Sequence, residues 1–238
     1  MQLFFDPHFD PSAPTAELDA DEARHALKVL RLDTGDTISV TDGRGNLCTC
    51  RIVSADRRRG SLTLRTEHVE PECGRLPYRL AMAVAPTKNI DRFEWFLEKA
   101  TEVGVSEIIP LETARSERRT LKSERAEKVI AAAMKQSLKC FCPQLHPMTT
   151  FAGLLSMPFG GRRFIAHCDA AGERRFLGDV LHAGEDAMVL IGPEGDFSPE
   201  EIAAALAHGF EPVTLGHQRL RTETAAVAAT VIAAAVNN

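Results

Sequence analysis

Three glycines and several ionisable side chains, Glu194, Arg221 and Glu223 among them, fall in two short stretches near the C-terminus of this 238-residue chain. Residues 189–195 are an apolar run that ends in Gly-Pro-Glu-Gly, and residues 215–225 lead from Leu-Gly into an alanine-rich segment. Glycine permits a positive φ and a close approach of backbone to ligand, which we expect at Gly192 and Gly195. Thr222 stands where the following helix needs its N-cap. Two such loops, each ending a buried strand, predict a pocket for a small ligand held by main-chain groups.

Composition predicts an ordinary globular protein, with 44% apolar residues. No apolar run approaches the roughly 18 residues of a membrane helix, and the N-terminus carries an early acid instead of a basic signal region. We therefore expect a cytoplasmic protein. The six cysteines include the pairs Cys48/Cys50 and Cys140/Cys142, but none has the usual spacing of zinc ligands, so we expect free thiols and no metal.

The net charge of −5 argues against a nucleic-acid partner, yet positive charge is concentrated locally. Residues 110–142 hold eight Lys/Arg against four Glu, a local charge of +4. Arg24, Lys28 and Arg31 lie at helical spacing, and residues 57–59 are three consecutive arginines. These clusters are either solvated faces or sites for RNA phosphates, because phosphate binding depends on local potential.

The chain changes character near residue 70. Before it, short alternating runs at 37–41, 47–53 and 61–66 predict strands, which one helix (21–31, capped by Asp19 or Asp21) interrupts; a small β-barrel is the natural closure. Residues 71–77 are a turn-rich linker. After it, strands at 79–85, 107–111, 163–168, 187–191 and 212–215 alternate with helices, and a capping box starts one helix at Ser198. This alternation predicts an α/β domain with a mostly parallel sheet covered on both faces.

The motifs resemble those of the SPOUT-class RNA methyltransferases, and in particular the ribosomal small subunit methyltransferase E family. The resemblance is carried by IGPEG at 191–195 and LG-x-x-x-LRTETA at 215–225, together with residues 25–36, 88–104, 115–118 and 136–137. It implies a PUA-like β-barrel that binds RNA (1–70), a linker (71–77) and a SPOUT methyltransferase domain with a C-terminal trefoil knot (78–238). It also implies a homodimer.

The resemblance further implies that the chain methylates N3 of a specific uridine in 16S ribosomal RNA or the small subunit, with S-adenosyl-L-methionine as cofactor. For the leucines of the two stretches, core packing is the alternative to ligand contact. The expected cofactor-binding residues are Leu190, Ile191, Gly192, Pro193, Gly195, Leu215, Gly216, Leu220, Arg221, Thr222, Thr224 and Ala225.

Methylation of N3 requires loss of its proton, and the ionisable candidates are Arg221, Glu194 and Glu223. Arg221 could stabilise a uracil carbonyl oxygen. Glu194 could accept the proton, or could instead cap nearby backbone N–H groups.

The cations best assigned to RNA phosphates or the target base are Arg115, Arg118, Arg119 and Lys139, with Arg24, Lys28 and Arg31 in the N-terminal part. Two positions depart from the family pattern. Leu138-Lys139 stands where a small or polar residue and Arg are common, and lysine lacks the bidentate fork of arginine. Asp196 stands where a second glycine is frequent, which puts the φ of this position in question.

Three other functions compete with this one. A 2′-O-ribose SPOUT methyltransferase is disfavoured because the chain lacks an N-G-x-x-R motif. A non-catalytic PUA-like RNA-binding protein is disfavoured by the intact glycines and the intact LRTETA block. A nucleotide-binding dehydrogenase is disfavoured because no G-x-G-x-x-G follows a strand.

Overall fold

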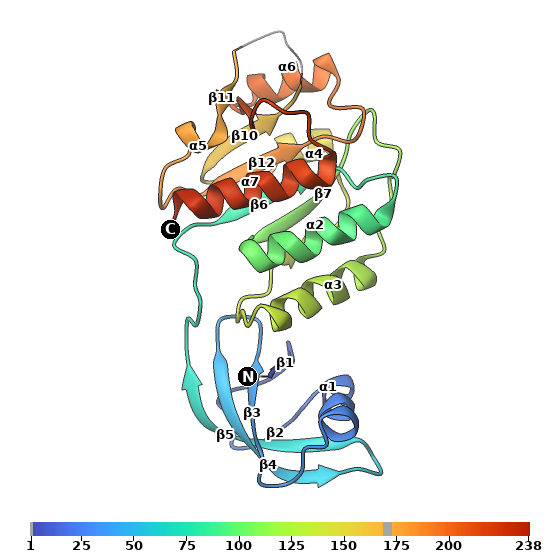
Figure 1. Cartoon of the computed structure of the whole chain (residues 1–238), viewed down its shortest axis with the longest axis vertical. Helices are drawn as coiled ribbons and strands as arrows, with labels where there is room; N and C mark the ends of the chain where they lie inside the picture. The colour runs from blue at the N-terminus through green and yellow to red at the C-terminus, as the bar shows by residue number, and fades with distance from the viewer. Residues whose placement is uncertain (1, 169–172) are drawn as a thin grey trace. The chain divides into compact units, whose positions relative to one another are not determined.

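The computed structural model describes residues 2–168 and 173–238. The chain forms two compact units (Figure 1). The first comprises Met1–Arg75 and Met134–Cys142, and the second comprises Leu76–Ala133 and Pro143–Asn238. Residues 134–142, which lie far along the chain from the rest of the first unit, join it through hydrogen bonds to the β3–β4 turn: Gly45 N–H donates to Cys140 O, and Cys142 N–H donates to Gly43 O.

The first unit is built on a five-stranded sheet of order β1-β3-β4-β5-β2. Its strands are β1 (Leu3–Phe5), β2 (Ala16–Glu17), β3 (Thr37–Thr41), β4 (Leu47–Asp56) and β5 (Ser61–Glu70). β3, β4 and β5 form an antiparallel meander around a core that includes Phe4, Ile52 and Leu64. The three strands predicted here are confirmed, and β4 and β5 run further than their patterns indicated.

The helix predicted at 21–31 is present, but its second half is a π-helix and it ends at Val29. Helix α1 (Ala20–Arg24) starts at the predicted cap Asp19, whose side chain accepts from two backbone N–H groups. From His25 to Val29 the chain continues as a π-helix, η1, in which Leu30 N–H donates to His25 O. Ala26 and Leu27 of this segment are buried in the core of the unit. Arg31 lies beyond the helix at φ 59°.

The second unit is built on a parallel sheet of order β11-β13-β10-β12-β6-β7-β8, with β9 paired to β7. Its strands are β6 (Leu80–Val84), β7 (Glu107–Glu112), β8 (Gln144–Leu145), β9 (Thr149–Thr150), β10 (Arg162–Ala166), β11 (Arg175–Phe176), β12 (Ala187–Ile191) and β13 (Glu211–Thr214). The five predicted strands are confirmed within one or two residues, and so is the parallel α/β sheet. The very short β8, β9 and β11 had no recognisable pattern.

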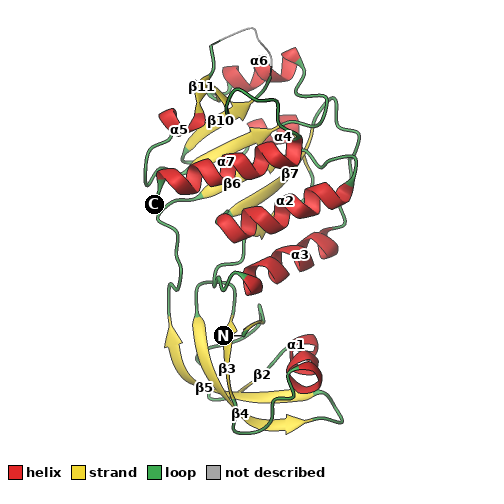
Figure 2. Ribbon diagram, viewed as in Figure 1, coloured by secondary structure: helices red, strands yellow, loops and turns green. Residues whose placement is uncertain are grey.

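Helices cover both faces of this sheet (Figure 2). The helices that follow β6 in the chain are α2 (Ile90–Val103), α3 (Ser123–Gln136), α4 (Phe151–Leu155), α5 (Leu177–Val180), α6 (Pro199–Ala207) and α7 (Thr222–Val236). One face packs against α4 and α6 through a cluster that contains Leu154, Leu190 and Ile202. α7 packs on β6, β12, α2 and α5. Of the helices described, none is long and apolar enough to cross a bilayer.

The N-cap residues predicted for α6 and α7 can be compared with the structure. At α6 the predicted capping box is present, with Ser198 and Glu201 each accepting from the other's backbone N–H. At α7 the predicted cap is wrong: Thr222 is the first helical residue and is buried, and the cap position belongs to Arg221, whose side chain makes no capping bond.

Candidate functional site

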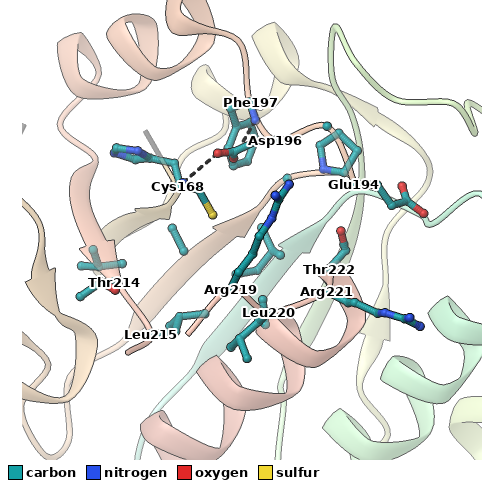
Figure 3. A pocket seen from close by; sticks show the side chains of 18 of the residues that line it. Cys168, Glu194, Asp196, Phe197, Thr214, Leu215, Arg219, Leu220, Arg221 and Thr222 are labelled. Atoms are coloured by element: carbon teal, nitrogen blue, oxygen red, sulfur yellow. Dashed lines mark hydrogen bonds between the residues drawn. The ribbon is translucent and has the colours of Figure 1, made fainter. Parts of the chain in front are cut away.

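A pocket of about 1230 Å³ opens where β10, β12 and β13 end (Figure 3). Its wall comes from residues 166–168 after β10, 191–197 after β12, and 213–222 between β13 and α7. In parallel sheets ligands bind outside the carboxyl ends of the strands, which is where these segments meet. The structure therefore brings the two predicted loops into one site.

Most of the predicted cofactor-binding residues line this pocket. They are Ile191, Gly192, Pro193, Gly195, Leu215, Gly216, Leu220, Arg221, Thr222 and Ala225. Two do not. Leu190 points from β12 into the core under α4 and α6, since side chains alternate between the faces of a strand. Thr224 is exposed in the first turn of α7, outside the pocket wall.

The first loop does not use its glycines as predicted. Neither Gly192 nor Gly195 has a positive φ; the left-handed residue of this turn is Asp196, at φ 61°. Gly192 is needed for space, because a Cβ there would lie 3.1 Å from the Phe197 ring and 3.2 Å from the Phe197 backbone nitrogen. Close approach, and not positive φ, explains this glycine.

The carboxylate of Asp196 ties the first loop to the end of β10. Its Oδ2 accepts from Cys168 N–H at 2.7 Å, and its Oδ1 accepts from Phe197 N–H at 2.8 Å. Asp tolerates the left-handed region better than most residues because its short polar side chain can bond locally. The departure at position 196 thus replaces glycine with a residue that anchors the turn.

The other acid of the loop, Glu194, lies exposed on the pocket rim. Its Oε1 accepts from Lys88 N–H at 3.0 Å. This is the capping role that the sequence left open, and it leaves Oε2 available to a ligand.

Two of the predicted RNA-binding arginines are engaged with backbone around the first loop. Arg115 Nη1 donates to Gly195 O at 2.8 Å and to Phe197 O at 3.2 Å. Arg118 Nε donates to Thr87 O at 3.1 Å, and Arg118 Nη2 donates to Lys88 O at 2.9 Å. Both side chains hold loops of the site in place.

The second loop brings Gly216 to the pocket with φ 131°, a conformation that favours glycine. Nothing lies within 4 Å of where its Cβ would be, so its backbone faces open space. Thr214 Oγ1 donates to Gly216 O at 2.8 Å and fixes the turn. Arg219 extends from this loop into the pocket, toward the segment that holds Asp196 and Phe197 (Figure 3).

Glu223 does not line the pocket. It is buried in the first turn of α7, with Oε1 3.8 Å from Nε of Arg92 on α2. Its Oε2 is buried without a hydrogen-bond partner in the part of the chain that the structure describes. Arg92 itself lines the pocket.

The pocket is electropositive, since the arginines on its wall outnumber Glu194 and Asp196. The arginines are Arg92, Arg115, Arg174, Arg219 and Arg221. Sequence reasoning missed Arg92, Arg174 and Arg219 as pocket residues. Arg219 could have been found, because it stands inside the second motif; Arg92 and Arg174 come from other segments.

The remaining predicted RNA contacts are surface cations. In the first unit Arg24, Lys28 and Arg31 are exposed, and Arg24 pairs with Asp21. Arg57 donates to Leu27 O, so the triple-arginine turn lies against the same helical segment and the two basic clusters form one surface.

Two further predicted RNA contacts complete the set. Arg119 pairs with Glu112 at 2.9 Å in the second unit. Lys139 is half-buried in the segment after α3, directly behind Leu138, which has φ 55°.

Comparison with protein families matches both units. Residues 74–234 match the RNA methyltransferase domain family, and residues 18–64 match the RNA methyltransferase PUA domain. The ribosomal RNA small subunit methyltransferase E of Synechocystis sp. is 30% identical over 216 residues, which cover 89% of this chain and 70% of that protein.

Two solved structures are similar over nearly their whole length. A probable rRNA-methyltransferase from Porphyromonas gingivalis has a TM-score of 0.92 and 40% identity, covering 100% of this chain and 98% of that one. A ribosomal RNA small subunit methyltransferase E from Neisseria gonorrhoeae, bound to S-adenosyl methionine, has a TM-score of 0.85 and 28% identity, covering 97% and 95%.

Proposed function

Because the chain belongs to the ribosomal RNA small subunit methyltransferase E family of RNA methyltransferases, we propose that it transfers a methyl group from S-adenosylmethionine to N3 of a uridine in 16S ribosomal RNA. The observation that carries the proposal is the single pocket formed by residues 191–197 and 215–222 at the carboxyl ends of parallel strands. The two loops come from separate parts of the sequence and enclose one site of cofactor size.

The pocket fits the adenosine part of this cofactor. A flat heterocycle needs apolar faces and backbone groups at its edge, and Ile191, Leu215 and Leu220 supply the apolar surface. Gly216 exposes its backbone to the pocket, where a side chain would occupy space. In the bound state the cofactor supplies an electrophilic methyl group on a sulfonium.

The chain's own groups prepare N3 of the uridine. Glu194 is the proposed proton acceptor: Lys88 N–H fixes one carboxylate oxygen, and the other is free to reach the substrate. Arg221, at the mouth of the pocket, is the proposed donor to a uracil carbonyl oxygen, where negative charge develops as the proton leaves. Glu223 is proposed as a positioning residue. It is buried beside Arg92, so it holds the Arg92 guanidinium and does not touch the substrate.

The two units have different roles in this proposal. The first, with the domain at 1–70, is proposed as a PUA-like barrel that holds RNA through its basic surface, followed by a linker at 71–77. The second, at 78–238, is proposed as a SPOUT domain with a C-terminal trefoil knot that works as a homodimer. Support for the SPOUT assignment comes from the match of residues 74–234 to the RNA methyltransferase domain family.

The function is tested by comparing modified nucleosides in ribosomal RNA from wild-type and deletion strains. We expect the deletion strain to lose one 3-methyluridine from 16S RNA and to regain it on complementation. Loss of a ribose methylation instead would favour a 2′-O-methyltransferase. Unchanged modification, together with no binding of S-adenosylmethionine in calorimetry, would favour a non-catalytic RNA-binding protein.

A further inference from the structure

One arginine on the pocket wall reaches inward and has no partner among the described residues. Arg115 binds two carbonyl oxygens, Arg174 donates to His167 O, and Arg92 pairs with Glu223. Arg219 makes no hydrogen bond or ion pair with any part of the chain that the structure describes, and it is exposed to the pocket. Arg221 is also unpaired among the described residues, but its side chain points away toward α2 (Figure 3).

Neither acid on the pocket wall pairs with Arg219 in the described part of the chain. Asp196 accepts from two backbone N–H groups, and Glu194 accepts from a third. Two carbonyls of the wall facing Arg219, those of Gly195 and Phe197, accept from Arg115. A guanidinium that is directed into a pocket and binds none of the acceptors described there is available to an anion that arrives with the ligand.

The proposed cofactor carries one such anion. Its adenosine half is neutral, its sulfonium is positive, and its amino-acid end has an ammonium group and a carboxylate. Two positive groups entering a pocket rich in arginine are opposed by repulsion unless the carboxylate is paired. We propose, building on the proposed function, that Arg219 binds the carboxylate at the amino-acid end of S-adenosylmethionine.

The position of Arg219 favours the cofactor over an RNA phosphate as the source of the anion. Its loop neighbours Gly216 and Leu220 both line the pocket, and its guanidinium crosses toward the loop that contains Asp196 (Figure 3). It therefore shares the cavity assigned to the adenosine half. Arg221, which points outward, is better placed for RNA.

Calorimetry with two ligands tests this assignment. S-Adenosylmethionine carries the carboxylate, whereas 5′-deoxy-5′-methylthioadenosine keeps the adenosine half and lacks the whole amino-acid end. The variants are Arg219→Gln and Arg219→Lys, with Arg175→Gln on the exposed strand β11 as the matched control outside the pocket.

We expect Arg219→Gln to weaken S-adenosylmethionine binding about tenfold or more, as for loss of a charge-assisted hydrogen bond. The affinity of Arg219→Lys for S-adenosylmethionine should lie between those of wild type and Arg219→Gln, because lysine keeps the charge and loses the planar fork. Methylthioadenosine should bind equally to wild type and all variants, and Arg175→Gln should match wild type for both ligands.

Three results would overturn the assignment. If Arg219→Gln binds S-adenosylmethionine like wild type, the carboxylate is held elsewhere. If it weakens both ligands equally, Arg219 supports the loop and not the carboxylate. If only RNA binding falls, the anion is a phosphate. Failure of the proposed function is distinct from all three. A non-catalytic protein would bind neither ligand even as wild type, and a ribose methyltransferase would bind both while the deletion strain kept its 3-methyluridine.

Discussion

Arg92 on α2 and Glu223 on α7 meet beneath the pocket, with Nε 3.8 Å from Oε1. The carboxylate is buried and its second oxygen has no partner among the described residues, whereas the Arg92 side chain is 40% exposed and lines the pocket. The pair thus joins the two helices that pack against each other on one face of the sheet. The buried Glu223 carboxylate also holds the side chain of Arg92, which lines the pocket.

Removing Arg92 alone should therefore cost more than removing both charges. Arg92→Ala leaves a buried carboxylate without its cation, at about 1–3 kcal/mol, and solvent screening of the exposed arginine favours the lower end. Arg92→Ala with Glu223→Gln should recover part of that loss, since no buried charge remains. Urea unfolding followed by fluorescence of Trp95, the single tryptophan, measures this in the second unit. Strictly additive effects of the two substitutions would contradict the coupling.

The anchor at Asp196 gives a second prediction, a graded series. Asp196→Ala loses both carboxylate bonds and keeps a Cβ at φ 61°, a conformation that costs about 1–2 kcal/mol relative to glycine and that alanine cannot offset with a local side-chain bond. Asp196→Gly removes the strain but not the loss of the bonds, and Asp196→Asn keeps an acceptor and tolerates the conformation. The expected order of stability is wild type, Asn, Gly, Ala. If Gly exceeds wild type in unfolding free energy by the full strain that it relieves, the two carboxylate bonds contribute nothing.

Gly216 gives a third prediction with a matched control. Gly216→Ala puts a methyl group into open pocket space at φ 131°, so we expect it to weaken S-adenosylmethionine binding by tenfold or more. Gly209 also has a positive φ, 80°, with nothing within 4 Å, but it lies after α6 and outside the pocket wall. Gly209→Ala should lose stability for the same backbone reason and keep its affinity. Calorimetry on both variants separates strain from ligand contact, and equal affinities would remove Gly216 from the site.

The basic surface of the first unit gives a fourth prediction. Lys28 is exposed beside the triple-arginine turn and has no hydrogen bond or ion pair within the described ranges. Lys28→Gln should weaken binding of a 16S RNA fragment and lower the slope of log K against log salt by about one, because one phosphate contact is lost. Lys28→Arg keeps the charge and should keep the slope. An unchanged slope in Lys28→Gln would place the RNA elsewhere.

Local signals in the sequence predicted local structure well. Strand β12 (Ala187–Ile191) and the capping box between Ser198 and Glu201 appear as expected, since each depends on residues close in the chain. The pocket loops were also found, because both motifs follow buried strands. Thr222 shows the limit of such signals: its type suits a cap, but the helix begins one residue earlier than that role requires.

What the sequence could not predict depends on partners far along the chain. The conformation of Asp196 is fixed by Cys168 N–H, and the site role of Arg92 by Glu223 on another helix. The path of residues 134–142 depends on bonds to Gly43 and Gly45 in the first unit. None of these contacts leaves a periodic or compositional trace, so only the fold reveals them.

The cysteines give the last prediction, because one of them lies on the pocket wall. Cys168 is exposed there, whereas Cys48 and Cys50 are buried in the first unit. Burial raises the pKa of Cys48 to about 12 and that of Cys50 to about 11, so both stay protonated and unreactive at pH 8. Iodoacetamide at pH 8 should therefore label Cys168 first, as read by peptide mass spectrometry.

Bound S-adenosylmethionine should protect Cys168 from that reagent. At ten times Kd only about one protein in eleven is free, so labelling should slow about tenfold if the ligand covers the thiol. The half-buried Cys73 and Cys142 of the first unit serve as internal controls, and their slower labelling should not respond to the ligand. A Cys168 rate that is the same with and without saturating ligand would mean that the cofactor does not occupy the part of the pocket beside β10.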